Sequence, residues 1–312
     1  MRMTCSPRTL LLTATGWAAL CGTALAQTPP VAPPATEAVR LEDVIITGTP
    51  FGVTDRASLL AVEVLDAEQL AVAPAATLGD LVNGLPGVRS SNFAPGASRP
   101  VIRGLSGPRV QVLTNGLGLI DASSVSPDHQ VAVDPAEASR IEIVRGPSTL
   151  VFGGSAIGGV VNIIDERVPT TRAGGGVDGH VSSQVSGIDN GRGGGASLKA
   201  NLGALVVTID GYSHRSDDYG IPGPALSQRL ADETGVPRAG PSTVANSAAE
   251  IEQAGAGLSW IGAGGYFGGS VKTTNSTYGT VAEPDVTIQL EQTRYDVRGE
   301  HTLGSEWFDK VR

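Results

Sequence analysis

The sequence predicts an α+β domain followed by antiparallel β-strands that form part of an incomplete outer-membrane β-barrel. Helix and strand signals are mixed between residues 51 and 170. From residue 171 onward, apolar and polar side chains alternate in segments near the length of a tilted membrane strand. The connections between these segments also alternate between short turns and longer loops, as in outer-membrane barrels. A soluble β-sandwich shares the alternation and is the alternative for this region.

Residues 1–26 have the pattern of a secretory signal peptide. Arg2 and Arg8 precede an apolar stretch at 10–20, and Ala24-Leu25-Ala26 forms an A-x-A cleavage site before Gln27. The apolar stretch is too short for a membrane helix, which needs about 20 residues. Both cysteines fall inside this peptide, so the predicted mature chain uses neither disulfides nor cysteine-bound metal.

Residues 27–50 are predicted to be a Pro-rich linker that ends in a short strand-like segment. The stretch 27–40 is rich in Pro and poor in large apolar residues, which is typical of an extended tether. The run 41–49 that follows has an acidic start and a β-branched middle, before Pro50.

The elements of the domain at 51–170 follow from capping, turn and periodicity signals. Asp66 can cap a helix that runs through Leu70, and Thr77 can cap a second helix at 78–85. The Asn115-Gly116 pair favours a hairpin turn. We expect another helix at 136–140 and strands at 61–65, 100–104, 109–113, 141–144 and 160–164.

About six barrel strands are expected in the region 171–312. Alternation marks them at 177–186, 196–202, 205–214, 251–261, 266–274 and 286–303. The longest loop, 216–250, is polar and rich in Pro, Gly and Ser. Only 312 − 171 = 141 residues follow residue 171, whereas a plugged barrel of about 22 strands needs roughly 220 residues for its strands alone. We therefore interpret the chain as a fragment of a larger protein.

The composition excludes several classes of function. The formal net charge is −9, with 22 basic and 31 acidic side chains, so a basic nucleic-acid-binding face is not expected. No G-x-S-x-G nucleophile motif occurs in the sequence. We therefore expect no enzyme and no interaction with nucleic acid.

A series of motifs in the α+β domain resembles the plug domain of TonB-dependent outer-membrane receptors. Their order along the chain is that of the family. The matching blocks are TLGDLV at 77–82, LPGV at 85–88, VIRG at 101–104, RVQVL at 109–113, IEIVRGP at 141–147 and FGG…AIGGVVNII at 152–164.

This resemblance implies a location, a partner and a set of roles. The location would be the outer membrane of a Gram-negative bacterium, with outer-membrane lipid around the barrel and no cofactor. The TonB box would bind a TonB-type energy-transducing protein in the periplasm, and it comprises Glu42, Asp43, Val44, Ile45, Ile46 and Thr47. Arg103, Glu142 and Arg145 would dock the plug against the barrel wall. The alternative for these three is solvated surface charge.

Further segments resemble the zinc-uptake receptors of the family. They are SPDH at 126–129, AVDP at 132–135 and HRSDDYGIPG at 214–223. The resemblance implies that Asp128, His129, His214 and Asp217 are metal ligands, since imidazole and carboxylate groups bind Zn²⁺. Ordinary surface-loop positions are the alternative for these side chains.

The whole pattern predicts a fragment of a receptor for energised uptake of a scarce nutrient. The cargo would be a metal ion or a metal chelate, with zinc favoured over an iron-siderophore complex or cobalamin. The alternative function is a secreted or cell-surface β-rich module for binding or adhesion, without transport.

Overall fold

The structure is a computed structural model that describes residues 44–45, 53–54, 61–73, 77–133, 138–238, 242–304 and 310–311. The predicted signal peptide at 1–26 and the linker stretch at 27–40 lie outside the described residues.

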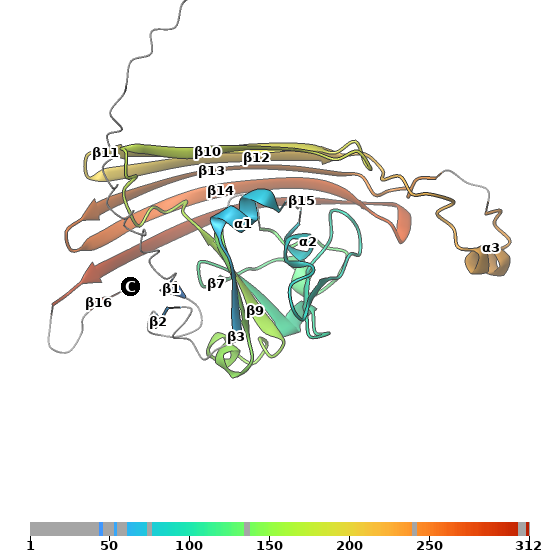
Figure 1. The fold of residues 1–312 in the computed structure, drawn as a ribbon, viewed down its shortest axis with the longest axis horizontal. Coiled ribbons are helices and arrows are strands. Elements are labelled where there is room, and N and C mark those ends of the chain that lie inside the picture. Colours follow the sequence, from blue (N-terminus) through green and yellow to red (C-terminus); the bar gives the residue numbers. More distant parts are fainter. Residues whose placement is uncertain are drawn as a thin grey trace, which may run out of the picture. The chain divides into compact units, whose positions relative to one another are not determined.

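A five-stranded mixed sheet forms the centre of the first domain (Figure 1). Its strand order is β3-β8-β9-β6-β7. The pair β6–β9 is parallel, and the other pairs are antiparallel. The strands span Ala61–Leu65 (β3), Val110–Thr114 (β6), Leu117–Gly118 (β7), Ala138–Arg145 (β8) and Gly159–Asp165 (β9). A separate two-stranded sheet pairs β4 (Val88–Ser90) with β5 (Pro100–Ile102).

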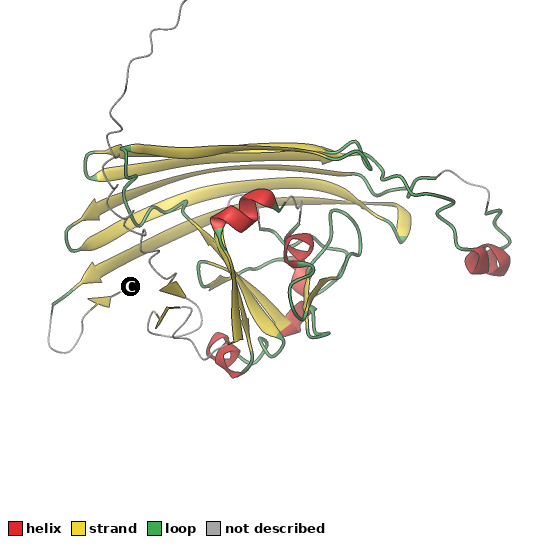
Figure 2. Ribbon diagram, viewed as in Figure 1, coloured by secondary structure: helices red, strands yellow, loops and turns green. Residues whose placement is uncertain are grey.

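The helices of this domain are short and begin at the predicted caps (Figure 2). In α1 (Ala67–Val72), Asp66 and Gln69 form a complete capping box. Thr77 caps α2 (Leu78–Val82), which ends three residues earlier than predicted because Asn83 already has extended backbone. Short 3₁₀ turns are η2 (Gly107–Arg109), η3 (Ala122–Ser124) and η5 (Pro147–Phe152). No helix among the described residues is long and apolar enough to cross a membrane.

The predicted helix at 136–140 is wrong where the structure describes it. Residues 138–140 are the start of β8. Ala138 pairs with Asp165 and Arg140 with Ile164 of β9. Pairing with a neighbouring strand overrides the helix propensity of this Ala- and Glu-containing stretch.

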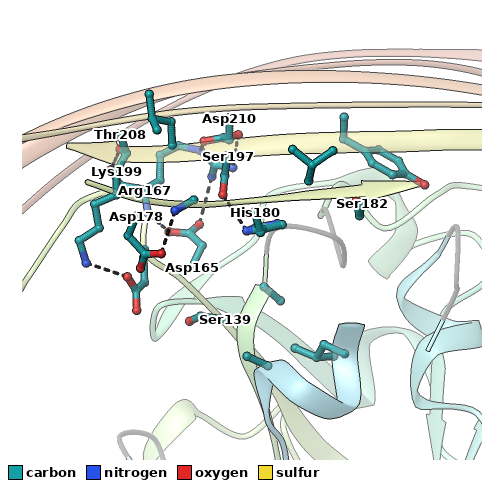
Figure 3. Close-up of a pocket in the computed structure, with 18 of the residues that line it drawn as sticks. Ser139, Asp165, Arg167, Asp178, His180, Ser182, Ser197, Lys199, Thr208 and Asp210 are labelled. Atoms are coloured by element: carbon teal, nitrogen blue, oxygen red, sulfur yellow. Dashed lines mark hydrogen bonds and ion pairs between the residues drawn. The ribbon is translucent and has the colours of Figure 1, made fainter. Parts of the chain in front are cut away.

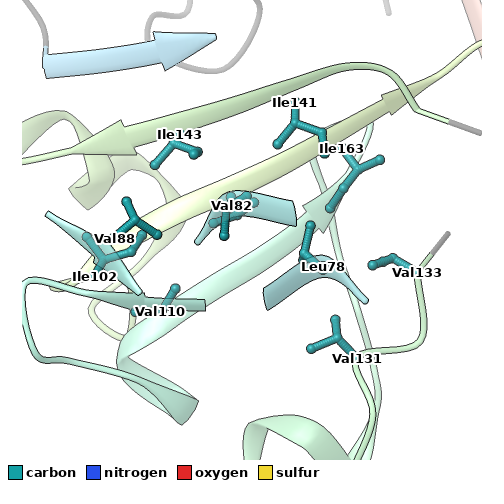
Figure 4. Packing of buried hydrophobic residues seen from close by; sticks show 11 residues of the cluster. Leu78, Val82, Val88, Ile102, Val110, Val131, Val133, Ile141, Ile143 and Ile163 are labelled. Carbon is teal, nitrogen blue, oxygen red and sulfur yellow. The ribbon is translucent and has the colours of Figure 1, made fainter. Parts of the chain in front are cut away.

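The core of the domain lies where α2 packs on the sheet (Figure 4). Leu78 and Val82 point from α2 toward β8 and β9, because their four-residue spacing places them on one helical face. The fully buried members around them include Ile102, Ile141 and Ile143. The domain therefore has an apolar interior of its own.

The region after residue 171 forms one antiparallel sheet of consecutive strands (Figure 1). Its order is β10-β11-β12-β13-β14-β15-β16, so β10 and β16 are its edges and the described strands do not close a barrel. The strands are β10 (Val177–Val185), β11 (Arg192–Leu202), β12 (Leu205–Ser216), β13 (Ala249–Gly262), β14 (Gly265–Thr280), β15 (Glu283–Thr302) and β16 (Lys310–Val311). A seven-residue helix, α3 (Gln228–Thr234), lies in the long loop after β12. The predicted fold class is confirmed.

β11 begins at Arg192, four residues before the expected strand at 196–202, and therefore includes the glycine run at 193–195. A Cβ on Gly193 would lie 2.8 Å from His214 Nδ1, and one on Gly195 would lie 3.2 Å from the Tyr212 ring. The lack of a side chain at these two positions of β11 makes room for the His214 and Tyr212 side chains of β12.

The two faces of this sheet differ in polarity. One face exposes apolar side chains, among them Val181, Leu198, Ile209, Trp260, Phe267, Tyr295 and Val297. The other carries polar side chains in rows across the strands; one row is His180, Ser197, Asp210, Gly255, Lys272 and Arg294. An apolar outside and a polar inside are the arrangement of a membrane barrel wall.

Candidate functional site

Two of the predicted metal ligands, Asp128 and His129, lie together in the loop after η3. Their Oδ1 and Nδ1 atoms are 3.1 Å apart. The Ser126 hydroxyl also donates to Asp128. This hydrogen bond is the main reason why the pKa of the Asp128 carboxyl is lowered, against a smaller opposing effect of desolvation. The loop thus presents an ionised carboxylate beside an imidazole.

A barrel residue holds this loop in place. The backbone N–H of Gln130 donates to the Tyr278 hydroxyl of β14 at 2.8 Å. Tyr278 is only 1% exposed and packs with Ala94 and Ala97 of a second plug loop. A Cβ on Gly96 would lie 2.5 Å from Tyr278 Cβ, so the loop fits only because this residue is glycine.

The other two predicted metal ligands have separate partners. His214 is 8% exposed on the inner face of β12, and its Nδ1 lies 3.2 Å from Gln184 Nε2. Asp217 follows β12 and accepts a hydrogen bond from Asn190 at 3.3 Å. Among the described residues, no group of three or more His, Cys, Asp or Glu side chains could hold a metal ion. The metal-ligand roles stay predictions.

The three residues predicted to dock the plug lie in different environments. Arg103 is exposed in the turn after β5, with a positive φ of 50°. Glu142 is completely buried and forms an ion pair with Arg140 at 3.1 Å. Arg145 forms an ion pair with Glu63 of β3 at 3.0 Å. The Arg145–Glu63 pair links β8 to β3, whereas Glu142 and Arg140 both lie on β8. The docking role of the three residues stays a prediction.

A residue that the sequence analysis missed makes a buried ion pair with the barrel wall (Figure 3). Arg167, two residues beyond β9, contacts Asp210 of β12 through two hydrogen bonds of 2.8 Å. Its backbone carbonyl accepts from Thr208 at 2.6 Å. The side chains of Arg167 and Asp210 are 6% and 7% exposed. A paired, bidentate geometry is what allows such charges to be buried.

Two glycines of β13 provide the space for Arg167. A Cβ on Gly255 would lie 2.3 Å from Arg167 Nε, and a Cβ on Gly257 would lie 1.8 Å from the Arg167 carbonyl oxygen. Glycine inside a strand often marks a close approach of another chain segment. We call Thr208, Asp210, Gly255 and Gly257 the Arg167 socket.

Asp165 extends the contact to a third barrel strand. It lies 3.2 Å from Arg167 Nη1 and 3.4 Å from Arg298 Nη2 of β15, and it accepts from Asn115 at 3.0 Å. Burial opposes ionisation of this carboxyl, but these cations and the amide together hold its pKa below the usual value. Lys199 of β11 adds an ion pair of 2.9 Å with Glu166.

A cavity of about 710 Å³ separates part of the plug from the barrel wall (Figure 3). On the plug side it is lined by Ala67 and Leu70 of α1 and by the charged residues Asp165, Glu166 and Arg167. On the barrel side Asp178, His180 and Ser182 of β10 line it. His180 Nδ1 lies 2.8 Å from Ser197 Oγ of β11.

Only the middle of the predicted TonB box is among the described residues. There, β1 (Val44–Ile45) pairs antiparallel with β2 (Val53–Thr54). Glu42, Asp43, Ile46 and Thr47 lie outside the described residues. The partner-binding role stays a prediction.

Comparisons with known proteins agree with this architecture. Residues 54–160 match the family model of the TonB-dependent Receptor Plug Domain. The chain is 29% identical over 182 residues to the vitamin B12 transporter BtuB of Photobacterium profundum, covering 56% of this chain and 29% of that protein. It is 32% identical over 203 residues to the ferric enterobactin receptor PirA of Pseudomonas aeruginosa, covering 58% and 26%.

Solved structures show the same fold. The copper transporter OprC superposes with a TM-score of 0.61 at 17% identity, over 80% of this chain and 36% of that one. The siderophore receptor PirA of Pseudomonas aeruginosa gives a TM-score of 0.54 at 21% identity, over 78% and 38%. The chain spans less than a third of the length of the two curated relatives named above.

Residues 54–160 therefore match the plug domain of TonB-dependent receptors, and the strands that follow share the fold of these solved structures. The predictions of an outer-membrane location and of a protein that is not an enzyme agree with these relatives, which are named as transporters and receptors. The narrower prediction of a zinc-uptake subgroup gains no support from these relatives, which are named for cobalamin, siderophore and copper.

Proposed function

We propose that the full-length protein containing this chain is a receptor for energised uptake of a scarce nutrient across the outer membrane. The observation that carries this proposal is the plug match at 54–160, together with the Arg167 socket that seats the plug on the inner, polar face of barrel strands. We place the signal peptide at 1–26, the linker at 27–50, the plug at 51–170 and the first part of the barrel from 171.

The energy would reach the plug through residues 42–47. A TonB-type protein in the periplasm would add this segment to its own sheet as a strand, so that main-chain hydrogen bonds carry the pulling force. The pairing of β1 with β2 supports a strand conformation at Val44–Ile45. Pulling would then displace part of the plug, for which residues 27–40 are the slack tether.

A proline at position 45 tests this coupling in the full-length protein. Ile45→Pro removes a backbone donor that strand addition needs. We expect uptake to fall to the level of a strain without the energy-transducing protein, while cargo binding to the outer membrane is unchanged. Ile45→Val, which keeps the donor, is the control. Uptake that survives Ile45→Pro would refute the coupling.

The cargo we propose is a metal ion or metal chelate, with zinc first. The Asp128–His129 pair supports zinc, since both groups are zinc ligands. Two relatives are named for vitamin B12 and ferric enterobactin, so cobalamin and iron-siderophore complexes are the alternatives to zinc. Growth of a strain lacking the gene, compared under zinc limitation and iron limitation, separates them. A defect confined to iron limitation, or cured only by cobalamin, would reject zinc.

Arg103, Glu142 and Arg145 remain proposed docking residues of the plug. The ion pairs Glu142–Arg140 and Arg145–Glu63 support a local role within the sheet. Arg103, exposed and strained at positive φ, is the one of the three we expect to meet the barrel.

A further inference from the structure

Two arginines lie side by side on the outer face of the barrel sheet. Arg192 of β11 and Arg215 of β12 are direct cross-strand partners, and both are exposed. Alternation from Leu198 and Ile209, which belong to the exposed apolar face, assigns both arginines to that face. Like charges directly opposite each other destabilise an antiparallel pair of strands. The sheet therefore carries a repulsive pair that a bound anion would neutralise.

No carboxylate neutralises this arginine pair within the described part of the chain. Glu250 of β13 lies opposite Arg215, but the two side chains form no ion pair there. Asp217, two residues beyond Arg215, accepts its hydrogen bond from Asn190 instead. Guanidinium groups bind phosphate oxygens through pairs of charge-assisted hydrogen bonds. Phosphate is thus an anion that suits the pair.

The arginine pair lies at the end of the sheet from which the longer connections leave. Residues 186–191 join β10 to β11 and residues 217–248 join β12 to β13, whereas only 203–204 join β11 to β12 at the other end. In outer-membrane barrels the longer loops are extracellular and the short turns periplasmic. The pair therefore faces the headgroup level of the outer leaflet.

An intermediate zone separates the arginines from the large apolar side chains of the same strands. Leu198 and Ile209 lie six residues from Arg192 and Arg215, which corresponds to about 20 Å along a strand. The residues between them on this face of β11 and β12 are Gly194, Ala196, Gly211 and Ser213.

An open groove of about 630 Å³ occupies this intermediate zone. Most of its lining residues alternate in phase with the exposed apolar side chains, which assigns the groove to the outer face. Gly194, Ala196 and Gly211 leave room close to the backbone. Glu252 of β13 and Asn275 of β14 line the groove and are exposed. Carboxylate and amide groups of this kind accept and donate hydrogen bonds to hydroxyl groups.

We propose that the groove binds a phosphorylated glycolipid of the outer leaflet. Arg192 and Arg215 bind its phosphate, Glu252 and Asn275 bind its sugar hydroxyl groups, and the apolar face beyond Ile209 contacts its acyl chains. A glycerophospholipid fits less well, because its phosphate is attached next to the acylated glycerol, whereas the groove separates charge from apolar surface by about 20 Å along the strands. The inference concerns the outside of the barrel and does not depend on the cargo.

Native mass spectrometry of the purified, delipidated full-length protein in a non-ionic detergent tests the inference. The probe is a bis-phosphorylated, acylated glucosamine disaccharide, added at the same concentration to every variant. Arg192→Gln combined with Arg215→Gln removes the charge pair. Arg229→Gln combined with Arg238→Gln removes the same charge from exposed positions in the loop after β12 and is the matched control.

We expect the Arg192→Gln, Arg215→Gln variant to bind the probe at least about tenfold more weakly, because its hydrogen bonds to phosphate are lost. The control variant should change by less than about twofold, because exposed charges away from the groove contribute little. Removing the repulsion should leave the melting temperature without lipid unchanged or higher. A lowered melting temperature would assign the arginines a structural role and overturn the inference.

Gly211→Val tests the groove itself. A Cβ on Gly211 lies 3.7 Å from the Gln253 carbonyl oxygen, which is an ordinary contact, so the valine fills the groove without straining the strand. We expect at least about fivefold weaker binding, because close-packed side-chain atoms exclude the sugar ring. Ala256→Val, exposed on β13 and outside the groove, is the control.

Three further outcomes would overturn the inference. They are unchanged binding in the Arg192→Gln, Arg215→Gln variant or in Gly211→Val, equal binding of phosphatidylglycerol, and equal binding of the disaccharide probe after removal of its phosphates. The proposed uptake function is judged separately, by the growth of the deletion strain.

Discussion

The interior of the plug and its contact with the barrel are built from different interactions. Inside, α2 and the sheet bury Leu78, Ile141 and Ile143 in an apolar cluster. At the barrel wall, the described contacts are mainly ion pairs and hydrogen bonds around Arg167 and Tyr278. An apolar core is lost only by unfolding, whereas polar contacts can be exchanged for water. The plug thus keeps its own fold by apolar packing, whereas its contact with the wall depends on a few buried polar pairs.

Removing Arg167 should have the largest effect on docking. Arg167→Met leaves Asp210 buried without its partner, which costs about 3–5 kcal/mol for a broken buried pair. We expect the plug of the full-length protein to become sensitive to protease at its linkers while its core stays resistant. Arg172→Met, at an exposed arginine that donates to the Ile261 carbonyl, is the control. Loss of the core fragment as well would show that docking and folding are not separable.

A glycine of the Arg167 socket provides a second, independent test of plug docking. Gly257→Ala places a methyl group on the Arg167 carbonyl and should loosen the plug in the same way. Gly174→Ala adds a methyl group in open space and should have no effect. Equal protease sensitivity of the two variants would argue against the socket.

Tyr278→Phe should give an intermediate effect at the other contact. The ring still packs, but the buried N–H of Gln130 loses its acceptor, at a cost of about 1–3 kcal/mol. Hydrogen exchange of the peptide around residue 130 should accelerate, while peptides of β8 should not change. Tyr295→Phe, at a residue that is 77% exposed, serves as control. Unchanged exchange near residue 130 would remove Tyr278 from the set of docking residues.

The substitution Ile141→Val tests the plug interior. It should lower the free energy of unfolding by about 0.5–1.5 kcal/mol. Ile141 is fully buried and shares no described partner with Arg167, so the two effects should add in the double variant. Urea unfolding of the two single variants and the double variant measures the coupling. A coupling energy well above about 0.5 kcal/mol would mean that the wall contacts hold the core together.

Of the changes considered, lowering the pH should weaken the docking of the plug the least. The pKa of Asp165 is lowered in the folded protein, so its charge contributes stability above the unfolded-state pKa of about 4. That contribution is lost as the pH falls through the lowered pKa. Protease sensitivity of the linkers should therefore rise more steeply at low pH in the native protein than in Asp165→Asn. Identical pH profiles would exclude Asp165 as a contributor.

Local signals in the sequence predict most of the plug and little of its docking. The capping residues Asp66 and Thr77 and the Asn115-Gly116 turn act over a few residues, and the structure has each of them in place. Asn115 and Gly116 both have positive φ, as this turn requires. Alternation likewise locates the barrel strands.

Arg167 escaped the sequence analysis because its partners are distant in the chain. Asp210 is 43 residues away, and the register that brings Gly255 opposite Asp210 cannot be read from alternation alone. One signal was available: Gly255 and Gly257 lie at inward positions of β13, where glycine indicates a close neighbour. The prediction of a helix at 136–140 was wrong for a related reason: residues 138–140 pair with β9, which is distant in the sequence.

The short connection between the Arg167 socket and β10 has a thermodynamic consequence. Residues 168–176 join the two, and even a fully extended chain of nine residues spans at most about 32 Å. An Arg167 side chain that leaves Asp210 therefore remains at an effective concentration in the millimolar range. Rebinding of Arg167 to Asp210 is intramolecular, so the fraction of docked plug does not depend on the concentration of the protein in the membrane.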